Sequence, residues 1–337
     1  MSESLKIVIP MAGLGTRLRP HTWSKPKPLI RIAGKPVLSY ILDLFQTLPD
    51  PDNVELIFII GHLGDQVRGF MKEVYPNIKT HYVIQEEMRG QSDAIYLAKD
   101  LLKGPMIIAY ADTILETSFA FLAQEKCDAV AWVKPVPDPR RFGVVELNDA
   151  GLVTGLVEKP EEPKTNLAVV GFYYFCDAEQ VISAIEEQMR LGITLKGEYF
   201  LTDAINILLK RGISMRTESV EVWLDAGTPE ALLDTNRYLL EHGRATDPSE
   251  FSAEGVAVIP PVYIDFGVDV HASVIGPYVS LGADCHIQDS IIRNSIIGED
   301  VHLTDTLLEG SILGSHVVVN GQPTSLNLGD SSWAMMK

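Results

Sequence analysis

The sequence predicts an α/β protein with a mostly parallel, Rossmann-like sheet, followed by a short left-handed parallel β-helix. Two observations predict this fold. Strand-like and helix-like runs alternate from residue 1 to about residue 240, and aliphatic residues recur at close to six-residue steps beyond residue 260. The chain has 337 residues, enough for two domains. We place them at residues 1–244 and 253–325.

Apolar, β-branched runs in the first domain predict buried strands, and longer periodic runs between them predict helices. Ligands of open α/β sheets bind at the carboxyl ends of strands. Gly13, Gln85, Asp112 and Gly143 each follow a predicted strand, so we expect them to converge. The expected strands are Lys6–Pro10, Glu55–Gly61, Thr80–Gln85, Met106–Ala111, Ala129–Val133 and Ala168–Phe175, and the expected helices are Val37–Leu48, Leu63–Val74, Asp93–Leu101, Ala178–Leu191 and Leu201–Arg211.

The second domain follows a polar segment, Ala245–Ser252, which contains Pro248 and is typical of a linker. In the repeats beyond it, an aliphatic residue at every sixth position would line the inside of a triangular coil, with small residues at the corners. About three or four coils of roughly eighteen residues fit the available length. An ordinary β-sandwich of short strands is the alternative. Clear repeat units include Val274-Ile275-Gly276, Ile296-Ile297-Gly298 and Ile312-Leu313-Gly314.

Composition excludes several classes of partner. The net charge of -17 repels phosphate backbones, so nucleic acid and anionic membrane are poor partners. Cys127, Cys176 and Cys285 show no metal-ligand spacing, and we expect reduced core thiols in a cytoplasmic protein. No signal peptide opens the chain and no apolar run reaches membrane length.

A glycine-rich loop, Gly13-Leu14-Gly15-Thr16-Arg17-Leu18-Arg19-Pro20, directly follows the first predicted strand. Glycines let main-chain N–H groups face an anion, and Arg17 adds a fork of donors. Lys25 and Lys27 add positive charge in a Pro-flanked polar loop, where we expect Lys27 to stay outside the core. The loop therefore predicts a nucleoside triphosphate site, and a strand-to-helix turn with solvated basic residues is the alternative.

This stretch resembles the opening pattern of the sugar nucleotidyltransferases, the NDP-sugar pyrophosphorylases, from Gly13 to Thr22 with a downstream Lys27. It lacks the Gly-Lys-Ser/Thr of a P-loop and the third glycine of a dinucleotide fingerprint. Thymidylyl members usually carry glycine where this chain has Ala12, and in this respect the loop looks more like the uridylyl members. The resemblance implies that Arg17 and Lys27 are catalytic. It also implies nucleotide binding by Ala12, Gly13, Gly15 and Thr16.

Further motifs follow in family order. The resemblance implies that Gln85 and Gly90 read the nucleobase, since an amide offers both a donor and an acceptor. It also implies that Asp112 and Asp225, the latter in Trp-x-Asp-x-Gly-Thr, hold Mg²⁺, a hard cation that suits carboxylates and phosphates. Taken alone, Gln85 reads as part of a polar loop, Asp112 as a strand-end turn, and Asp225 as the region before a helix that starts near Thr228.

A second set of motifs resembles the family's sugar-phosphate site. Gly143 would permit close backbone approach, Glu158 would accept from sugar hydroxyls, and Lys159 would bind the sugar phosphate. Val170 and Gly171 would line the pocket through their backbone. A solvated Glu–Lys pair is the alternative for residues 158 and 159. For the Gly197-Glu198 and Thr202-Asp203 motif we expect helix capping.

The resemblance implies a Mg²⁺-dependent transfer of a nucleoside monophosphate from dTTP or UTP to a sugar 1-phosphate, with glucose 1-phosphate as the leading acceptor. A mannose-1-phosphate guanylyltransferase is the enzymatic alternative, and a non-catalytic sugar-nucleotide-binding assembly protein is the alternative of another class. We expect a homo-oligomer that assembles through the β-helix. Four histidines in the repeats are expected on the coil surface rather than in an acyl-transfer site: His271, His286, His302 and His316.

Overall fold

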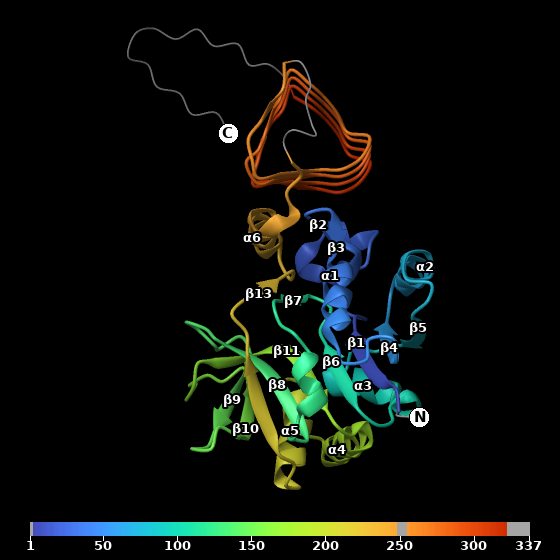
Figure 1. The fold of residues 1–337 in the computed structure, drawn as a ribbon, viewed down its shortest axis with the longest axis vertical. Helices are drawn as coiled ribbons and strands as arrows, with labels where there is room; N and C mark the ends of the chain where they lie inside the picture. Colours follow the sequence, from blue (N-terminus) through green and yellow to red (C-terminus); the bar gives the residue numbers. More distant parts are fainter. Residues whose placement is uncertain (1–2, 248–254, 322–337) are drawn as a thin grey trace. The chain divides into compact units, whose positions relative to one another are not determined.

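The computed structural model describes residues 3–247 and 255–321, and the chain divides into two compact units (Figure 1). The first unit comprises Met1–Arg31 and Lys35–Leu232, and the second comprises Ile32–Gly34 and Leu233–Lys337. The short segment Ile32–Gly34 therefore belongs with the second unit although it lies early in the chain. No helix in the described ranges is both long and apolar enough to cross a membrane.

One half of the main sheet in the first unit is parallel, in the strand order β6-β1-β4-β5. Val8 in β1 is fully buried and pairs with Ile57 on one side and Ile108 on the other. Because the four strands run in the same direction, the loops that follow them lie at one edge of the sheet. These strands are β1 (Leu5–Pro10), β4 (Val54–Ile60), β5 (Lys79–Ile84) and β6 (Met106–Ala109).

The other half of this sheet is mainly antiparallel and is organised by β11, which pairs with β6, β8 and β9. β11 pairs with β8 on both sides of a register shift between Val169 and Tyr173, while its other edge pairs with β9 at Ala168 and with β6 from Phe172 onward. A small antiparallel pair, β7 with β13, lies outside the main sheet. These strands are β7 (Thr113–Leu115), β8 (Ala129–Pro135), β9 (Gly143–Leu147), β10 (Val153–Glu158), β11 (Leu167–Phe175), β12 (Met215–Ser219) and β13 (Trp223–Asp225), and the short hairpin strands β2 (Arg31–Ile32) and β3 (Lys35–Pro36) precede them.

The helices begin and end where local sequence dictates. In α4, the Asp177 side chain accepts hydrogen bonds from the N–H groups of Glu179 and Gln180, and Gly192 ends the helix at φ 65°. The α-helices observed within the expected ranges 37–48 and 93–101 end early, because the last residues of each range form a 3₁₀ turn. The helices are α1 (Val37–Leu44), α2 (Gly64–Val74), α3 (Gln91–Leu97), α4 (Ala178–Leu191), α5 (Leu201–Lys210) and α6 (Pro229–Leu239).

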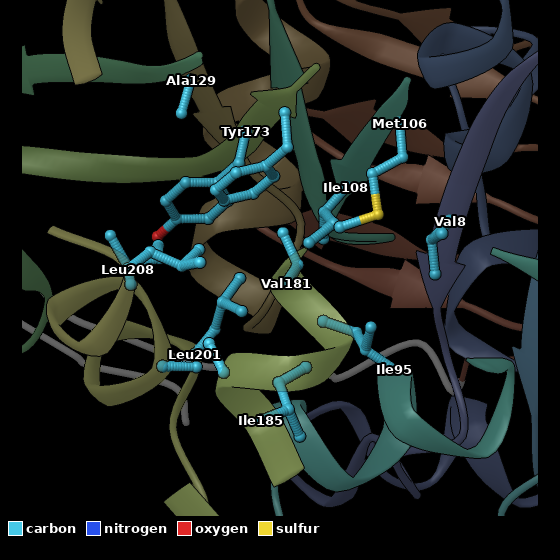
Figure 2. Close-up of a cluster of buried hydrophobic side chains, with 14 of the residues drawn as sticks. Val8, Ile95, Met106, Ile108, Ala129, Tyr173, Val181, Ile185, Leu201 and Leu208 are labelled. Carbon is cyan, nitrogen blue, oxygen red and sulfur yellow. The ribbon is translucent and has the colours of Figure 1, made fainter. Parts of the chain in front are cut away.

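The core of the first unit joins the sheet to α3, α4 and α5. Figure 2 shows Tyr173 and Ile108 of the sheet facing Val181 of α4 and Leu201 of α5, all within one buried cluster. Burying an aliphatic side chain of this size contributes about 1.5–3 kcal/mol. The helices pack on the sheet through this cluster, and the sheet positions the loops at its carboxyl edge.

The second unit contains a parallel β-helix with three faces, each a sheet of four short strands in the described residues. Ala257 pairs with Val274, Val274 with Ile291, and Ile291 with Leu307, so each coil takes 16 or 17 residues rather than eighteen. Figure 1 shows the triangular coils. The strands are β14 (Ala257–Val258), β15 (Val262–Ile264), β16 (Asp269–His271), β17 (Val274–Ile275), β18 (Val279–Leu281), β19 (His286–Gln288), β20 (Ile291–Arg293), β21 (Ile296–Ile297), β22 (His302–Thr304), β23 (Leu307–Glu309), β24 (Ile312–Leu313) and β25 (Val318–Asn320).

Inward aliphatic side chains fill the coils, as the six-residue period predicts: Ile275, Ile287 and Ile292 are buried. One face packs on the end of α6. The buried Asn236 side chain accepts hydrogen bonds from the Ala33 N–H at 3.0 Å and from the Ser280 hydroxyl at 2.6 Å. The four repeat histidines are exposed on the coil surface, as expected.

Several expectations need correction. Gly143 does not follow a strand; it opens β9. Part of the expected linker is structured, since the Thr246 N–H donates to the Val262 carbonyl at 2.8 Å, while residues 248–252 lie outside the described residues. Residues 253–254 and 322–325 of the predicted second domain also lie outside them. Cys176 is exposed and is not a core thiol, whereas Cys285 is buried.

Candidate functional site

The glycine-rich loop after β1 owes its shape to positions where a side chain does not fit. Gly15 has φ 59°, and a Cβ there would lie 2.9 Å from Thr22 Cγ2. The Thr22 hydroxyl donates to the Gly15 carbonyl at 2.9 Å, which closes the loop. Gly13 is exposed, as is Thr16, which opens a 3₁₀ turn. The loop therefore presents backbone at the carboxyl edge of the sheet, as an anion site requires.

The base of this loop packs against the neighbouring strand. Ala12 is buried, and Gly61, directly after β4, would bring a Cβ within 2.6 Å of the Ala12 carbonyl oxygen. Any larger residue at position 61 would push the loop away. Gly61 is a contributor to loop position that the sequence motif does not include.

Four charged side chains gather beside the loop. Lys27 Nζ contacts Asp112 Oδ2 at 2.5 Å, and the Lys27 side chain is only 14% exposed. Gly227 separates Arg17 from Asp225: a Cβ at position 227 would lie 2.7 Å from Asp225 Oδ1 and 3.2 Å from Arg17 Nη2. The structure therefore brings together two cations and two carboxylates from three distant parts of the sequence.

The β7–β13 pair places the two carboxylates next to one another. Asp225 is the last residue of β13 and lies opposite Thr113, the first residue of β7. The Ala226 N–H donates to the Asp112 carbonyl at 2.9 Å. Because Asp112 immediately precedes Thr113, the backbone pairing fixes both aspartates at the same end of a short hairpin-like ribbon.

The electrostatics of the aspartate pair suit a cation. Burial raises the pKa of Asp225, and the nearby Asp112 carboxylate raises it further, while Lys27, the Gly227 N–H and Arg17 oppose the shift. Asp225 keeps an exposed surface, so neighbouring protein atoms desolvate it without closing it off from a ligand. In the described ranges no three or more His, Cys, Asp or Glu residues group as a metal site. Two carboxylates completed by substrate phosphates are a common arrangement for Mg²⁺.

The residues predicted to read the base form a separate cluster on the loop after β5. Gln85 is buried, and its Nε2 donates to Asp93 Oδ2 at 3.1 Å. Arg89 donates to the other oxygen of Asp93 at 2.7 Å. Gly90 has φ 109°, and a Cβ there would lie 2.5 Å from the Tyr199 backbone nitrogen. Asp93 is 2% exposed, and it was not predicted as a site residue.

The residues predicted to bind the sugar phosphate meet at the start of β9 and the end of β10. Gly143 pairs with Glu158, and a Cβ at Gly143 would lie 3.0 Å from Glu158 Oε2. Lys159 Nζ lies 3.7 Å from Glu158 Oε1 and 4.4 Å from the centre of the Phe200 ring. Burial raises the pKa of Glu158, an effect that Lys159 partly offsets. The pair is thus partly buried and not a freely solvated surface pair.

Val170 and Gly171 lie where β11 changes partners. Val170 and Gly171 are both buried, backbone included, so the expectation that their backbones line a ligand pocket is not met in this structure. Gly171 has φ 86°, and a Cβ there would lie 2.6 Å from the Tyr110 ring. The Tyr110 N–H donates to the Gly171 carbonyl at 3.0 Å. Since Tyr110 is two residues before Asp112, this contact joins the predicted sugar residues to the aspartate pair.

A second contact joins the same two groups. The rings of Phe142 and Trp223 pack edge to face with centroids 4.9 Å apart. Phe142 adjoins Gly143, and Trp223 is two residues before Asp225.

The predicted capping role of Thr202 and Asp203 is wrong, because α5 begins after Phe200 without a side-chain cap. Thr228 does begin α6, since its hydroxyl accepts from the Ala231 N–H at 3.2 Å.

Comparison with known proteins agrees with this geometry. A family model described as nucleotidyl transferase matches residues 6–242. The chain belongs to the nucleotidyl transferase family.

This family member is 30% identical over 317 residues to the glucose-1-phosphate thymidylyltransferase of Streptomyces griseus, covering 87% of each chain. It is 32% identical to the low-salt glycan biosynthesis nucleotidyltransferase Agl11 of Haloferax volcanii, again over 87% of each chain. Among solved structures, a candidate glucose-1-phosphate thymidylyltransferase of Bacillus anthracis in complex with sucrose matches with a TM-score of 0.59 at 27% identity, over 74% of this chain and 98% of that one. The predicted fold class and family are confirmed.

Proposed function

We propose that this nucleotidyl transferase is a Mg²⁺-dependent sugar-1-phosphate nucleotidyltransferase. One observation carries the proposal: the charged residues Arg17, Lys27, Asp112 and Asp225 form a single cluster. Tyr110 and Trp223 make the contacts that connect this cluster to the predicted sugar-phosphate residues. Cations and metal-binding carboxylates beside a sugar site are what transfer between two phosphates requires.

The reaction joins two anions. An oxygen of the sugar phosphate forms a bond to the α-phosphorus of the nucleoside triphosphate, and the bond from that phosphorus to the bridging oxygen of pyrophosphate breaks. The electron pair leaves with pyrophosphate. Because the sugar phosphate attacks the α-phosphorus directly, no covalent enzyme intermediate is needed. The attacking phosphate is ionised at neutral pH, so no strong base is needed either. Positioning and charge neutralisation supply the catalysis.

Each charged residue has a role in this scheme. Arg17, at the end of the glycine loop, neutralises charge on the triphosphate, and Lys27 stabilises the leaving pyrophosphate. Asp112 and Asp225 would hold Mg²⁺, which supplies charge neutralisation between the phosphates when bound. Lys27 already contacts Asp112, so the same carboxylate orients the lysine and would bind the metal.

The acceptor residues act by orientation. Glu158 accepts hydrogen bonds from sugar hydroxyls, and Lys159 binds the sugar phosphate that attacks. Gly143 would let the backbone approach the sugar closely, and a Cβ there would lie 3.0 Å from Glu158 Oε2 and crowd that carboxylate. Val170 and Gly171 are buried and would act by holding Tyr110 in place, not by touching the sugar. The name of the Streptomyces griseus relative favours glucose 1-phosphate as acceptor and dTTP as donor, and UTP is the alternative donor.

A pyrophosphate-release assay over a matrix of nucleotides and sugar 1-phosphates tests this proposal. With Mg²⁺ present, we expect release that requires both substrates and is strongest with dTTP or UTP and glucose 1-phosphate. Release without the sugar phosphate, or none with any pair, would contradict it. A non-catalytic sensor would bind the same ligands and release nothing.

We further propose that the β-helix assembles the protein as a homo-oligomer. Its outward face of β17, β20 and β23 carries Val274, Ile291 and Leu307 in one register column, and Leu307 is 75% exposed. The adjacent column pairs Arg293 with Glu309. Two copies could pack these faces together around a two-fold axis that runs parallel to the strands, between β20 and β23. Arg293 of one copy would then face Glu309 of the other. Leu307→Arg should lower the solution mass, and an unchanged mass would contradict this interface.

A further inference from the structure

The side-chain amide of Gln85 is held by a buried carboxylate. Its Nε2 donates to Asp93 Oδ2 at 3.1 Å, and both side chains are almost fully buried. The other oxygen of Asp93 accepts from Arg89 Nη2 at 2.7 Å, so the buried charge is paired. Arg89 lies before α3 begins and is not part of a helical ion pair. The three residues form one connected unit on the loop after β5.

This contact determines which way the Gln85 amide points. An ionised carboxylate only accepts hydrogen bonds, so the atom facing Asp93 must be the NH₂ group. The carbonyl oxygen Oε1 is then turned to the other side. No residue in the described ranges bonds to this oxygen, so it remains an acceptor for a ligand.

Gly90 supplies the complementary group. Its backbone N–H has no hydrogen-bond partner among residues 3–247 and 255–321. The loop around it is fixed to Tyr199: the Tyr199 N–H donates to the Arg89 carbonyl at 2.8 Å, and the Ser92 N–H donates to the Tyr199 carbonyl at 3.0 Å. One loop thus carries one acceptor, Gln85 Oε1, and one donor, the Gly90 N–H.

We propose that Asp93 is a specificity-determining positioning residue, which holds the Gln85 carbonyl toward the nucleobase. An acceptor with a donor complements a base that carries a ring N–H next to a carbonyl, as uracil, thymine and guanine do. Cytosine and adenine present a ring nitrogen acceptor and an amino group, and leave the Gln85 carbonyl facing another acceptor. This inference rests on the proposed function, since it assigns the base class at the same site.

A purely structural role for Asp93 makes a different prediction. If Asp93 only stabilises the loop, its replacement weakens all nucleotides equally. If it acts through Gln85, replacement changes the order of nucleotides. Asp93→Asn keeps the shape but can either donate or accept, so the Gln85 amide is free to turn over.

The experiment is a calorimetric titration of UTP, dTTP, GTP, CTP and ATP with Mg²⁺ into wild type, Asp93→Asn, Gln85→Ala and the double variant. Wild type should prefer the first three nucleotides by at least roughly tenfold, because CTP and ATP mismatch both the Gln85 carbonyl and the Gly90 N–H. Asp93→Asn should reduce this preference, chiefly by improving CTP and ATP relative to UTP. In the Gln85→Ala background it should have no further effect on preference. Asp65→Asn, an exposed first-turn aspartate of α2, is the matched control and should leave the order unchanged.

Two results would overturn the inference: equal binding of CTP and UTP by wild type, which needs no variant, or an unchanged preference in a folded Asp93→Asn. Pyrophosphate release is measured in parallel. Base-selective binding without release would contradict the proposed function and leave the role of Asp93 standing. Pyrophosphate release without base selectivity would support the proposed function and contradict the role of Asp93.

Discussion

The Lys27 ammonium contacts the Asp112 carboxylate at 2.5 Å, although the two residues are 85 positions apart. The sequence motifs assign Lys27 to neutralising charge on the phosphates and Asp112 to binding the metal. Their contact means that a change to either residue alters the electrostatic surroundings of both.

Replacing Lys27 should therefore impair catalysis far more than folding. Lys27→Met should lower kcat/KM by roughly 10²–10³-fold, the usual cost of removing one charged stabiliser. It should cost about 1 kcal/mol or less in stability, because Asp112 remains partly solvated. Steady-state kinetics and thermal unfolding measure the two effects. The control is Lys35→Met, whose ammonium pairs with Asp43 at 2.7 Å in an exposed pair. Equal loss of activity in both variants would contradict the role of Lys27.

The two aspartates should behave as one metal site. Asp112→Asn and Asp225→Asn each keep shape but remove charge, so the Mg²⁺ concentration for half-maximal activity should rise in both. Because the residues share a ligand, the double variant should be little worse than the worse single variant. Kinetics of all three variants against Mg²⁺ concentration provide the measurement. Multiplicative effects, or full activity in EDTA, would show that the pair holds no catalytic metal.

The raised pKa of Asp225 predicts a pH-dependent stability. The pKa of Asp225 is higher in the folded protein than in the unfolded chain. Above the folded pKa, ionised Asp225 therefore lowers the free energy of unfolding. Below the unfolded pKa the carboxyl is protonated in both states, and this loss of stability is absent. In EDTA, Asp225→Asn should therefore melt at a higher temperature than wild type at pH 7. The difference should shrink as pH falls through the raised pKa and vanish near pH ~4. Thermal unfolding from pH 4 to pH 8 tests this; a variant less stable at pH 7 would refute the sign.

The contact of Gly171 with Tyr110 should be sensitive to a single methyl group. Gly171→Ala adds a Cβ 2.6 Å from the Tyr110 ring at a positive φ, so we expect a loss of about 2–4 kcal/mol from overlap plus strain. Gly212→Ala is the matched control, because Gly212 has φ 94° but no atom within 4 Å of the added Cβ. It should cost only about 1 kcal/mol. Chemical denaturation compares the two, and equal losses would mean that Tyr110 yields easily.

Local patterns predicted much of the fold because they report burial directly. The runs that became β1, β4, β5 and β6 match the expected strands to within two residues at each end. The six-residue period likewise predicted the coils, although not their shorter length of 16 or 17 residues. Short elements such as β2, β3 and β7 were missed, since two or three residues carry no periodicity.

The candidate site was predictable only where its residues lie within a motif. Lys27 was expected in a solvated loop, but tertiary contact with Asp112 leaves it 14% exposed. The motifs give no role to Asp93 or Tyr110, and only the fold shows that they contact Gln85 and Gly171. Such contacts depend on strand order, which a single sequence does not specify.

The most direct test of the central claim follows the oxygen atoms. Sugar 1-phosphate labelled with ¹⁸O on its non-bridging phosphate oxygens is converted with unlabelled nucleoside triphosphate and Mg²⁺, and the products are examined by ³¹P NMR. Direct attack on the α-phosphorus predicts that one labelled oxygen bridges the two phosphorus atoms of the nucleotide sugar, while the released pyrophosphate stays unlabelled. Label in pyrophosphate, or a nucleotide sugar whose bridging oxygen is unlabelled, would contradict the proposed transfer.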